Sequence, residues 1–172
     1  MGEMATVLVI AAIAVVLVAA SLVRRAPRGE CLVVTRHRRI VRIASDSMTL
    51  AVPGFHEVLE WPTGPMEIAI VVRTRTADAQ DVRVLATFTV EVDPPRVGAA
   101  YIDPRAVLHT ALERRVSDAV RARPASRLTG PDGLTAAIEG IRIDGLAAGV
   151  VTDMVIDEVD LLLHPGRPDD DG

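Results

Sequence analysis

The sequence predicts an α+β protein in which an amino-terminal transmembrane helix precedes a domain of antiparallel strands and two main helices. Three patterns carry this prediction: an apolar run at residues 5–23, a strict alternation of apolar and polar side chains at 81–92, and an apolar stripe at helical spacing within 103–123. The length of 172 residues suits one domain with an attached element. The predicted division is a transmembrane anchor at 1–25, a domain at 26–163 and an acidic disordered tail at 164–172.

The apolar run from Ala5 to Val23 is long enough to cross a membrane as a helix. Its 19 residues, at ~1.5 Å each, give roughly 28 Å, close to the ~30 Å hydrocarbon thickness. Arg24, Arg25 and Arg28 follow the run and no positive side chain precedes it. The positive-inside bias therefore predicts a single-pass cell-membrane protein with its carboxyl-terminal domain in the cytoplasm. A cleaved signal peptide and the reversed topology are the alternatives.

Short β-branched runs bounded by turn residues predict the strands of the domain. Between residues 81 and 92, Val82, Val84, Ala86, Phe88, Val90 and Val92 alternate with mainly polar residues. This period of two predicts a half-buried strand in an antiparallel sheet with one wet face. Further strands are expected at 30–36 and 39–44 as a hairpin, and at 50–52, 55–59, 67–75 and 150–163.

Two helices are expected after the Asp93-Pro94-Pro95 break. Asp103 is a candidate N-cap before a proline at the first helical position, and Pro124 stops the helix. Its apolar stripe consists of Leu108, Leu112, Val116 and Val120. A second helix is expected from Pro131, with Leu134, Ile138 and Ile141 on one face and Gly149 as its C-cap.

Composition excludes several classes of protein. The chain is 49% hydrophobic with a net charge of −4, which excludes a disordered protein. A pI near 5.5 opposes nucleic-acid binding. All 19 basic residues are arginine, typical of a GC-rich bacterial genome. The four aromatic residues are expected to anchor the core: Phe55, Trp61, Phe88 and Tyr101.

No residue pattern predicts catalysis or a cofactor. The histidines show no metal-ligand spacing, and no Gly-x-Ser-x-Gly elbow or glycine-rich phosphate loop is present in the sequence. The lone Cys31 cannot form an internal disulfide and is expected to be a small buried hydrophobe. The sequence therefore predicts a protein that is not an enzyme, with no catalytic, cofactor-binding or metal-binding residue. The residues considered were His37, His56, His109, His164, Ser45, Ser47, Ser117 and Ser126.

Two charged clusters have competing interpretations. The arginine cluster at 36–42 fits either contact with anionic lipid headgroups or a solvated hairpin turn. The carboxylates Asp153, Asp157, Glu158 and Asp160 favour the wet face of the last strand over acid–base chemistry.

Four local strings follow the apolar run in a particular order. They are Gly29–Val34 (GECLVV), Pro53–His56 (PGFH, then Trp61-Pro62), Thr74–Pro94 and Gly149–Val159. Behind a single anchor, this order resembles the stomatin/prohibitin/flotillin/HflK-C (SPFH, band 7) family over about residues 5–163. Two features depart from the family: its long Ala/Glu-rich coiled coil does not follow the domain, and Asp78-Ala79-Gln80 replaces its usual Asp-Gly.

The resemblance implies a non-catalytic, membrane-anchored scaffold that self-associates or organises membrane proteins at the cytoplasmic face. Implied partners are membrane lipid, further copies of the chain and longer SPFH proteins; without the coiled coil, smaller oligomers or such partnering stay open. Alternatives are an accessory regulatory subunit of a membrane protease and a small anchored hydrolase with an unrecognised site. The surfaces expected for association are the exposed edge of the sheet holding 81–92 and the arginine-bearing helix 103–123.

Overall fold

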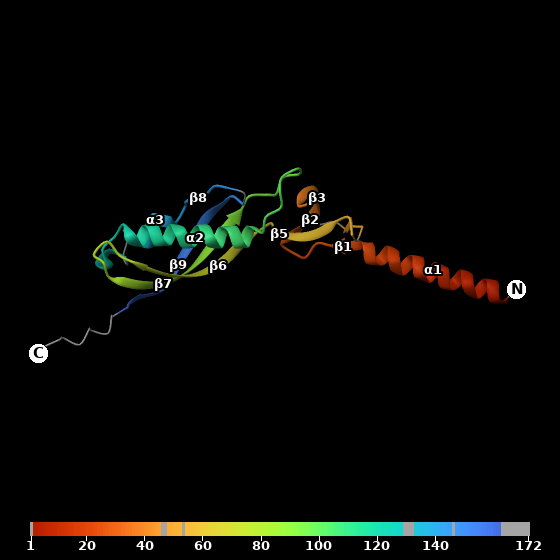
Figure 1. The fold of residues 1–172 in the computed structure, drawn as a ribbon, viewed down its shortest axis with the longest axis horizontal. Helices are drawn as coiled ribbons and strands as arrows, with labels where there is room; N and C mark the ends of the chain where they lie inside the picture. Colours follow the sequence, from red (N-terminus) through yellow and green to blue (C-terminus); the bar gives the residue numbers. More distant parts are fainter. Residues whose placement is uncertain (1, 46–47, 53, 129–132, 146, 163–172) are drawn as a thin grey trace, which may run out of the picture. The chain divides into compact units, whose positions relative to one another are not determined.

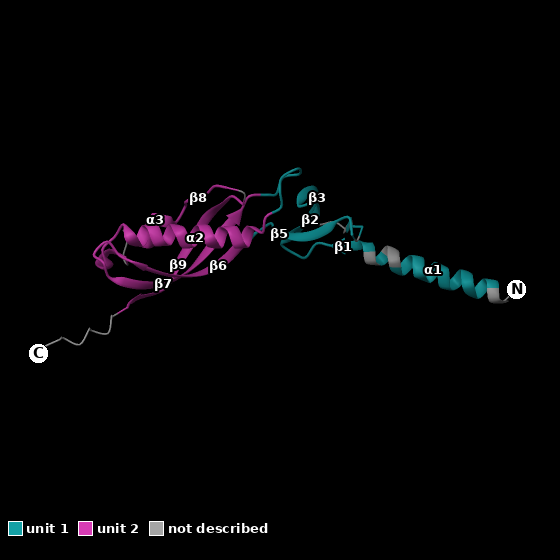
Figure 2. Ribbon diagram, viewed as in Figure 1, with its two compact units in different colours: residues 1–64, 94–101 teal, residues 65–93, 102–172 magenta. Residues whose placement is uncertain are grey.

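The computed structural model describes residues 2–45, 48–52, 54–128, 133–145 and 147–162. These residues form two compact units, coloured separately in Figure 2. Unit 1 contains residues 1–64 and 94–101, and unit 2 contains residues 65–93 and 102–172. The boundaries at residues 25 and 163 stay predictions, and the predicted acidic tail lies outside the described residues.

Unit 1 begins with a helix formed by the apolar run, α1 (Gly2–Leu22). Large apolar side chains along it are exposed, with exposed fractions between 54% and 75% from Met4 to Leu17. The predicted helix is therefore present. However, no helix among the described residues is both long enough and apolar enough to cross a membrane. The expected transmembrane helix is accordingly not found.

The helix α1 ends at Leu22, before the arginines that follow it. Val23–Arg25 forms a short strand, β1, because its backbone pairs antiparallel with β4 (Met48–Leu50). Arg24 lies opposite Thr49 in this pair. Arg24 and Arg25 therefore belong to a sheet of unit 1.

The second sheet of unit 1 is three-stranded and antiparallel. β2 (Glu30–Arg36) lies between β3 (Arg39–Ser45) and β5 (Glu57–Pro62), so the predicted hairpin is confirmed. The backbone turns through His37 and Arg38 at φ 50° and 62°, the geometry of a two-residue type I′ turn. Both turn side chains are exposed.

The aromatic residues of unit 1 do not all reach the core. Trp61 is buried and meets Tyr101 edge to face, with ring centroids 6.1 Å apart. Phe55, in contrast, is 68% exposed, so its predicted core role is wrong. It follows Gly54, whose φ of 84° turns the chain before β5 begins.

Unit 2 is a four-stranded antiparallel sheet with helices on one face (Figure 1). The strand order is β6 (Pro65–Arg75), β7 (Asp81–Val92), β9 (Gly149–Leu161) and β8 (Arg142–Ile143). The alternation along β7 is confirmed, since Val82, Val84, Ala86, Phe88 and Val90 are all buried beneath the helices.

The helix predicted after the proline break is α2 (Pro104–Arg121). The Asp103 carboxylate accepts a hydrogen bond from the Arg105 N–H at 2.9 Å, which confirms the N-cap. The stripe of Leu108, Leu112, Val116 and Val120 is fully buried. A 3₁₀ turn, η1 (Ala125–Arg127), follows.

The second predicted helix is much shorter than expected. α3 (Leu134–Ile138) ends before Gly140, which has a φ of 74° and donates its N–H to the carbonyl of Val151. Pro131 lies outside the described residues. Gly149 is no C-cap: it opens β9, where an added Cβ would come within 2.8 Å of the Glu91 carbonyl oxygen.

Candidate functional site

The described histidines belong to different segments of the chain. His37 is in the hairpin turn, His56 precedes β5 and His109 is on α2, while His164 lies outside the described residues. Across the residues that the structure describes, no group of three His, Cys, Asp or Glu side chains could hold a metal ion.

The sulfur and hydroxyl candidates have structural surroundings. Cys31 is buried in β2, and burial raises the pKa of its thiol. Ser117 donates a hydrogen bond to the Thr74 hydroxyl at 3.3 Å. Ser45 and Ser126 are exposed, and Ser47 lies outside the described residues.

Two of the four β9 carboxylates considered, Glu158 and Asp160, form ion pairs with β7. Arg83 of β7 donates from Nε to Asp160 at 3.0 Å and from its terminal nitrogen to Glu158 at 3.3 Å. Asp157 accepts a hydrogen bond from the Thr87 hydroxyl at 3.0 Å. Asp153 is exposed. This arrangement agrees with the predicted wet face.

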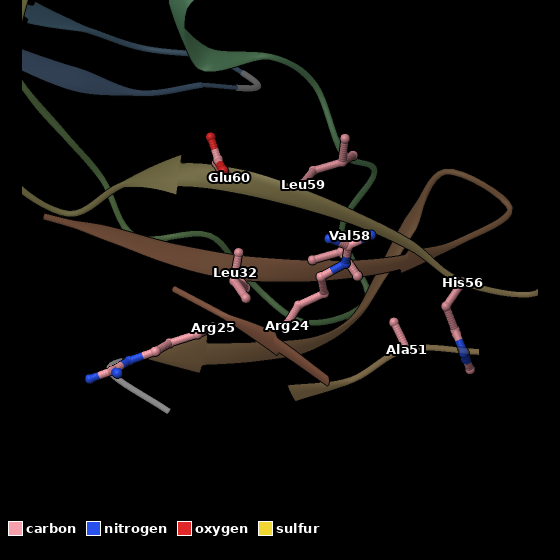
Figure 3. A pocket seen from close by; sticks show the side chains of 8 residues that line it. All are labelled: Arg24, Arg25, Leu32, Ala51, His56, Val58, Leu59 and Glu60. Atoms are coloured by element: carbon pink, nitrogen blue, oxygen red, sulfur yellow. The ribbon is translucent and has the colours of Figure 1, made fainter. Parts of the chain in front are cut away.

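A hollow of about 540 Å³ lies in unit 1, directly after α1 in the chain (Figure 3). It gathers residues from β1, from the segment before β5, and from β2 and β5. Its lining residues are Arg24, Arg25, Leu32, Ala51, His56, Val58, Leu59 and Glu60.

The strand register explains how the lining is assembled. Leu32 pairs with Glu60 and Val34 with Val58, so these four side chains share one face of the β2–β5 pair. Figure 3 shows Arg24 extending towards Val58, with Arg25 directed the other way. Neighbouring residues of a strand point to opposite faces. Arg25 is thus placed at the rim.

His56, which lines the hollow, and Thr49, which pairs with the lining residue Arg24, have well-defined hydrogen-bonding states. The Val52 N–H lies 3.4 Å from Nδ1 of His56 and donates to it, which leaves Nε2 of the imidazole as the position for a proton donor. Thr49 is 2% exposed, and its hydroxyl has no hydrogen-bond partner among the described residues. Neither Arg24 nor Arg25 forms an ion pair with a described residue.

Unit 2 presents two surfaces of another kind. α2 and β8 border a hollow of about 880 Å³ that Arg114, Arg115 and Asp118 line from the helix. In the sheet that holds residues 81–92, β7 is an inner strand, which pairs with β6 on one side and β9 on the other. The edge strands of this sheet are β6, which is 11 residues long, and β8, which has two residues, so β6 offers the longer edge.

The backbone groups at this edge follow from the turn after β6. The Thr76 N–H donates to the Gln80 carbonyl at 2.9 Å, and hydrogen-bonded pairs alternate along an antiparallel ladder. The even-numbered residues of β6 therefore bond to β7, and the odd-numbered ones face outward. In agreement, the carbonyl of Glu67 accepts a side-chain hydrogen bond from Arg105 at 3.4 Å.

The sequence profile of the SPFH domain / Band 7 family matches residues 24–130, which is more than half of the chain. The chain belongs to the SPFH domain / Band 7 family. The match begins within β1 and extends past η1, so it covers strands of both units and all of α2. A search of curated proteins finds no match to the chain.

Three of the four sequence strings that resemble the family lie within the matched residues. The fourth, Gly149–Val159, lies outside them. Family membership also supports a membrane-associated, scaffold-type role in general, in a family that is generally non-enzymatic. One departure from the SPFH pattern is visible in the structure. Ala79, within the string that replaces the usual Asp-Gly, has a φ of 63°, a conformation that favours glycine.

Proposed function

We propose that this SPFH-domain chain is a non-catalytic scaffold that attaches to the cell membrane through α1 and self-associates on the cytoplasmic side. Contiguous exposed apolar surface marks contact with a membrane or a protein. The exposed apolar side chains from Met4 to Leu17 form such a surface. This observation carries the proposal, and family membership supports it.

The charges next to α1 support the orientation. Arg24, Arg25 and Arg28 follow the helix, and all three are exposed. Basic residues beside an apolar segment favour the cytoplasmic side, where anionic lipids attract them. Lipid, other copies of the chain and longer SPFH proteins are the partners that this proposal expects.

Native mass after mild extraction tests the scaffold proposal. The tagged full-length chain would be extracted from its own membranes in mild detergent, and its mass and co-purifying proteins determined. We expect a particle several times the 18.4 kDa of one chain. A co-purified protease would favour an accessory regulatory subunit instead. A monomer without partners, or a chain recovered only from the soluble fraction, would refute the proposal.

Orientation needs a separate measurement. Cys31 is buried, so a cysteine introduced at Val97, which is 63% exposed, would serve as the reporter. With a membrane-impermeant maleimide, we expect labelling in inverted vesicles and protection in intact cells. Labelling in intact cells would place unit 1 on the outside.

A further inference from the structure

The hollow after α1 carries an excess of positive charge. Arg24, Arg25 and His56 are its basic lining residues, and Glu60 is its one carboxylate. Figure 3 shows Glu60 directed away from the Arg24 side chain. Because both guanidinium groups lack ion pairs with described residues, their donors are available to a ligand. A guanidinium presents its N–H groups in a planar fork that matches the oxygens of a phosphate group.

The rest of the lining is apolar. Leu32 and Ala51 are 3% and 8% exposed, and Val58 and Leu59 are half-buried. An apolar wall with a few placed polar groups, and a volume within about 300–1,000 Å³, is typical of a small-molecule site. The hollow therefore suits a ligand that combines an anionic group with apolar parts.

A buried hydroxyl lies next to the lining residue Arg24, although it does not itself line the hollow. Thr49 lies directly opposite Arg24 in the β1–β4 pair, so the two side chains leave the same face of that pair. A buried hydroxyl without a partner is costly and calls for a missing hydrogen-bond partner. Since Thr49 is not part of the lining, the site depends on Arg24, Arg25 and His56.

We infer that this hollow binds the phosphate group of an anionic membrane lipid. The inference rests on the proposed membrane attachment, because α1 leads into β1 without an intervening linker and would bring the hollow to the headgroup layer. Arg24 would contact the phosphate oxygens, with His56 donating from Nε2 and Arg25 at the rim. The apolar wall would contact the glycerol and upper acyl carbons.

The test compares lipids retained by the full-length chain. The protein would be placed in nanodiscs containing equal amounts of phosphatidylcholine and phosphatidylglycerol, and retained lipids counted by native mass spectrometry. We expect the wild type to retain phosphatidylglycerol preferentially. Arg24→Gln and His56→Gln should each reduce this preference by about tenfold, the effect of losing one charge-assisted hydrogen bond.

Arg28→Gln is the matched control, because Arg28 is exposed near α1 but does not line the hollow. If the hollow is a binding site, Arg28→Gln should keep the preference for phosphatidylglycerol. If only the general surface charge matters, Arg28→Gln should lower this preference as much as Arg24→Gln does. That second result would overturn the inference. Arg24→Lys keeps the charge and removes the fork, so it should also lose most of the preference. Trp61 fluorescence would verify that unit 1 of each variant is folded.

A further arm distinguishes lipid from free phosphate. Inorganic phosphate added to the nanodiscs should not displace the retained phosphatidylglycerol; displacement at low concentration would identify a soluble phosphate ligand and refute the lipid assignment. Wild-type protein that enters nanodiscs without any lipid preference would overturn the site and leave the scaffold proposal intact. Protein that stays outside the nanodiscs would refute both.

Discussion

Ala79 holds a backbone conformation that usually belongs to glycine. It lies in the turn between β6 and β7, where Asp78 accepts hydrogen bonds from the Thr76 hydroxyl and from the Ala125 N–H. The Thr76 hydrogen bond is the main cause of the lowered pKa of the Asp78 carboxyl. These contacts fix the turn, so the strain at Ala79 persists in the folded chain.

We therefore predict that Ala79→Gly stabilises unit 2. The left-handed region costs a residue with a Cβ about 1–2 kcal/mol, whereas glycine loses about 0.4–1 kcal/mol through its freer unfolded state. The expected net gain is about 0.5–1 kcal/mol in the free energy of unfolding, measured by urea denaturation followed by circular dichroism.

Ala77→Gly in the same turn is the control. The φ of Ala77 is not positive, so the substitution relieves no strain and acts only by making the unfolded chain freer. A loss of about 0.4–1 kcal/mol in the free energy of unfolding is expected. Equal losses in both variants would show that the left-handed strain at Ala79 is relieved in solution.

Cys31 is predicted to make stability depend on alkaline pH. Burial raises the pKa of its thiol above the ordinary 9.0, so the folded state holds the proton longer than the unfolded state does. The contribution of the protonated Cys31 thiol to the free energy of unfolding is therefore fully present below the ordinary thiol pKa. This contribution is lost as pH rises through the raised pKa of the folded state. Denaturation of wild type and Cys31→Ala between pH 7 and about 10.5 should show a steeper decline for the wild type. Parallel curves would contradict the prediction.

The sequence could reveal some residue roles and not others. Asp103 was recognisable as an N-cap because the cap is local, and Phe88 because strand periodicity buries it. Phe55 was not recognisable as exposed, since its position depends on the turn at Gly54. Likewise, Arg24 and His56 lie 32 residues apart in the sequence, and only the β1–β4 pairing and the segment after it bring them to one hollow.

At the scale of elements, β6 is a long strand with one paired and one free side. Its side chains alternate between exposed and buried along nearly its whole length. The backbone groups of odd-numbered residues face the free edge, whereas those of even-numbered residues form hydrogen bonds with β7. Neighbouring residues should therefore differ in their tolerance of proline.

We predict opposite outcomes for proline at two adjacent positions of β6. Val71 directs its N–H to the free edge, so Val71→Pro removes no ladder hydrogen bond and should change the free energy of unfolding by less than about 1 kcal/mol. Val72 bonds to β7 opposite Val84, so Val72→Pro should cost at least about 1–3 kcal/mol. Urea denaturation checks both. Similar losses at the two positions would show that the free edge is covered.

Sequence patterns predicted strands better than the second helix. Alternation over 81–92 determined the limits of β7, because a half-buried strand requires that period. The apolar spacing of Leu134, Ile138 and Ile141 fits a helix equally well. Tertiary pairing prevailed here, since the Ile141 carbonyl accepts the Val151 N–H at 3.0 Å.

For the whole molecule, the membrane proposal depends on α1. We predict that Ile10→Arg, a change at a residue 62% exposed in mid-helix, sharply lowers co-flotation of the full chain with lipid vesicles. An arginine at the centre of a membrane segment costs about 2.5–3.5 kcal/mol on insertion scales. Arg115→Gln on α2 serves as the control and should float like the wild type. Undiminished flotation of Ile10→Arg would assign membrane contact to another surface.

The chain passes between its two units three times, at residues 64, 93 and 101. Residues 94–101 return to unit 1, where the Ile40 N–H donates to the Ala99 carbonyl at 2.8 Å and Arg39 bridges to Ala100. A ribosome synthesising this protein therefore makes the whole β6–β7 hairpin of unit 2 before the last segment of unit 1. Neither unit is therefore made as one continuous stretch of chain. A gene truncated at residue 64 would yield a first unit that lacks its last segment.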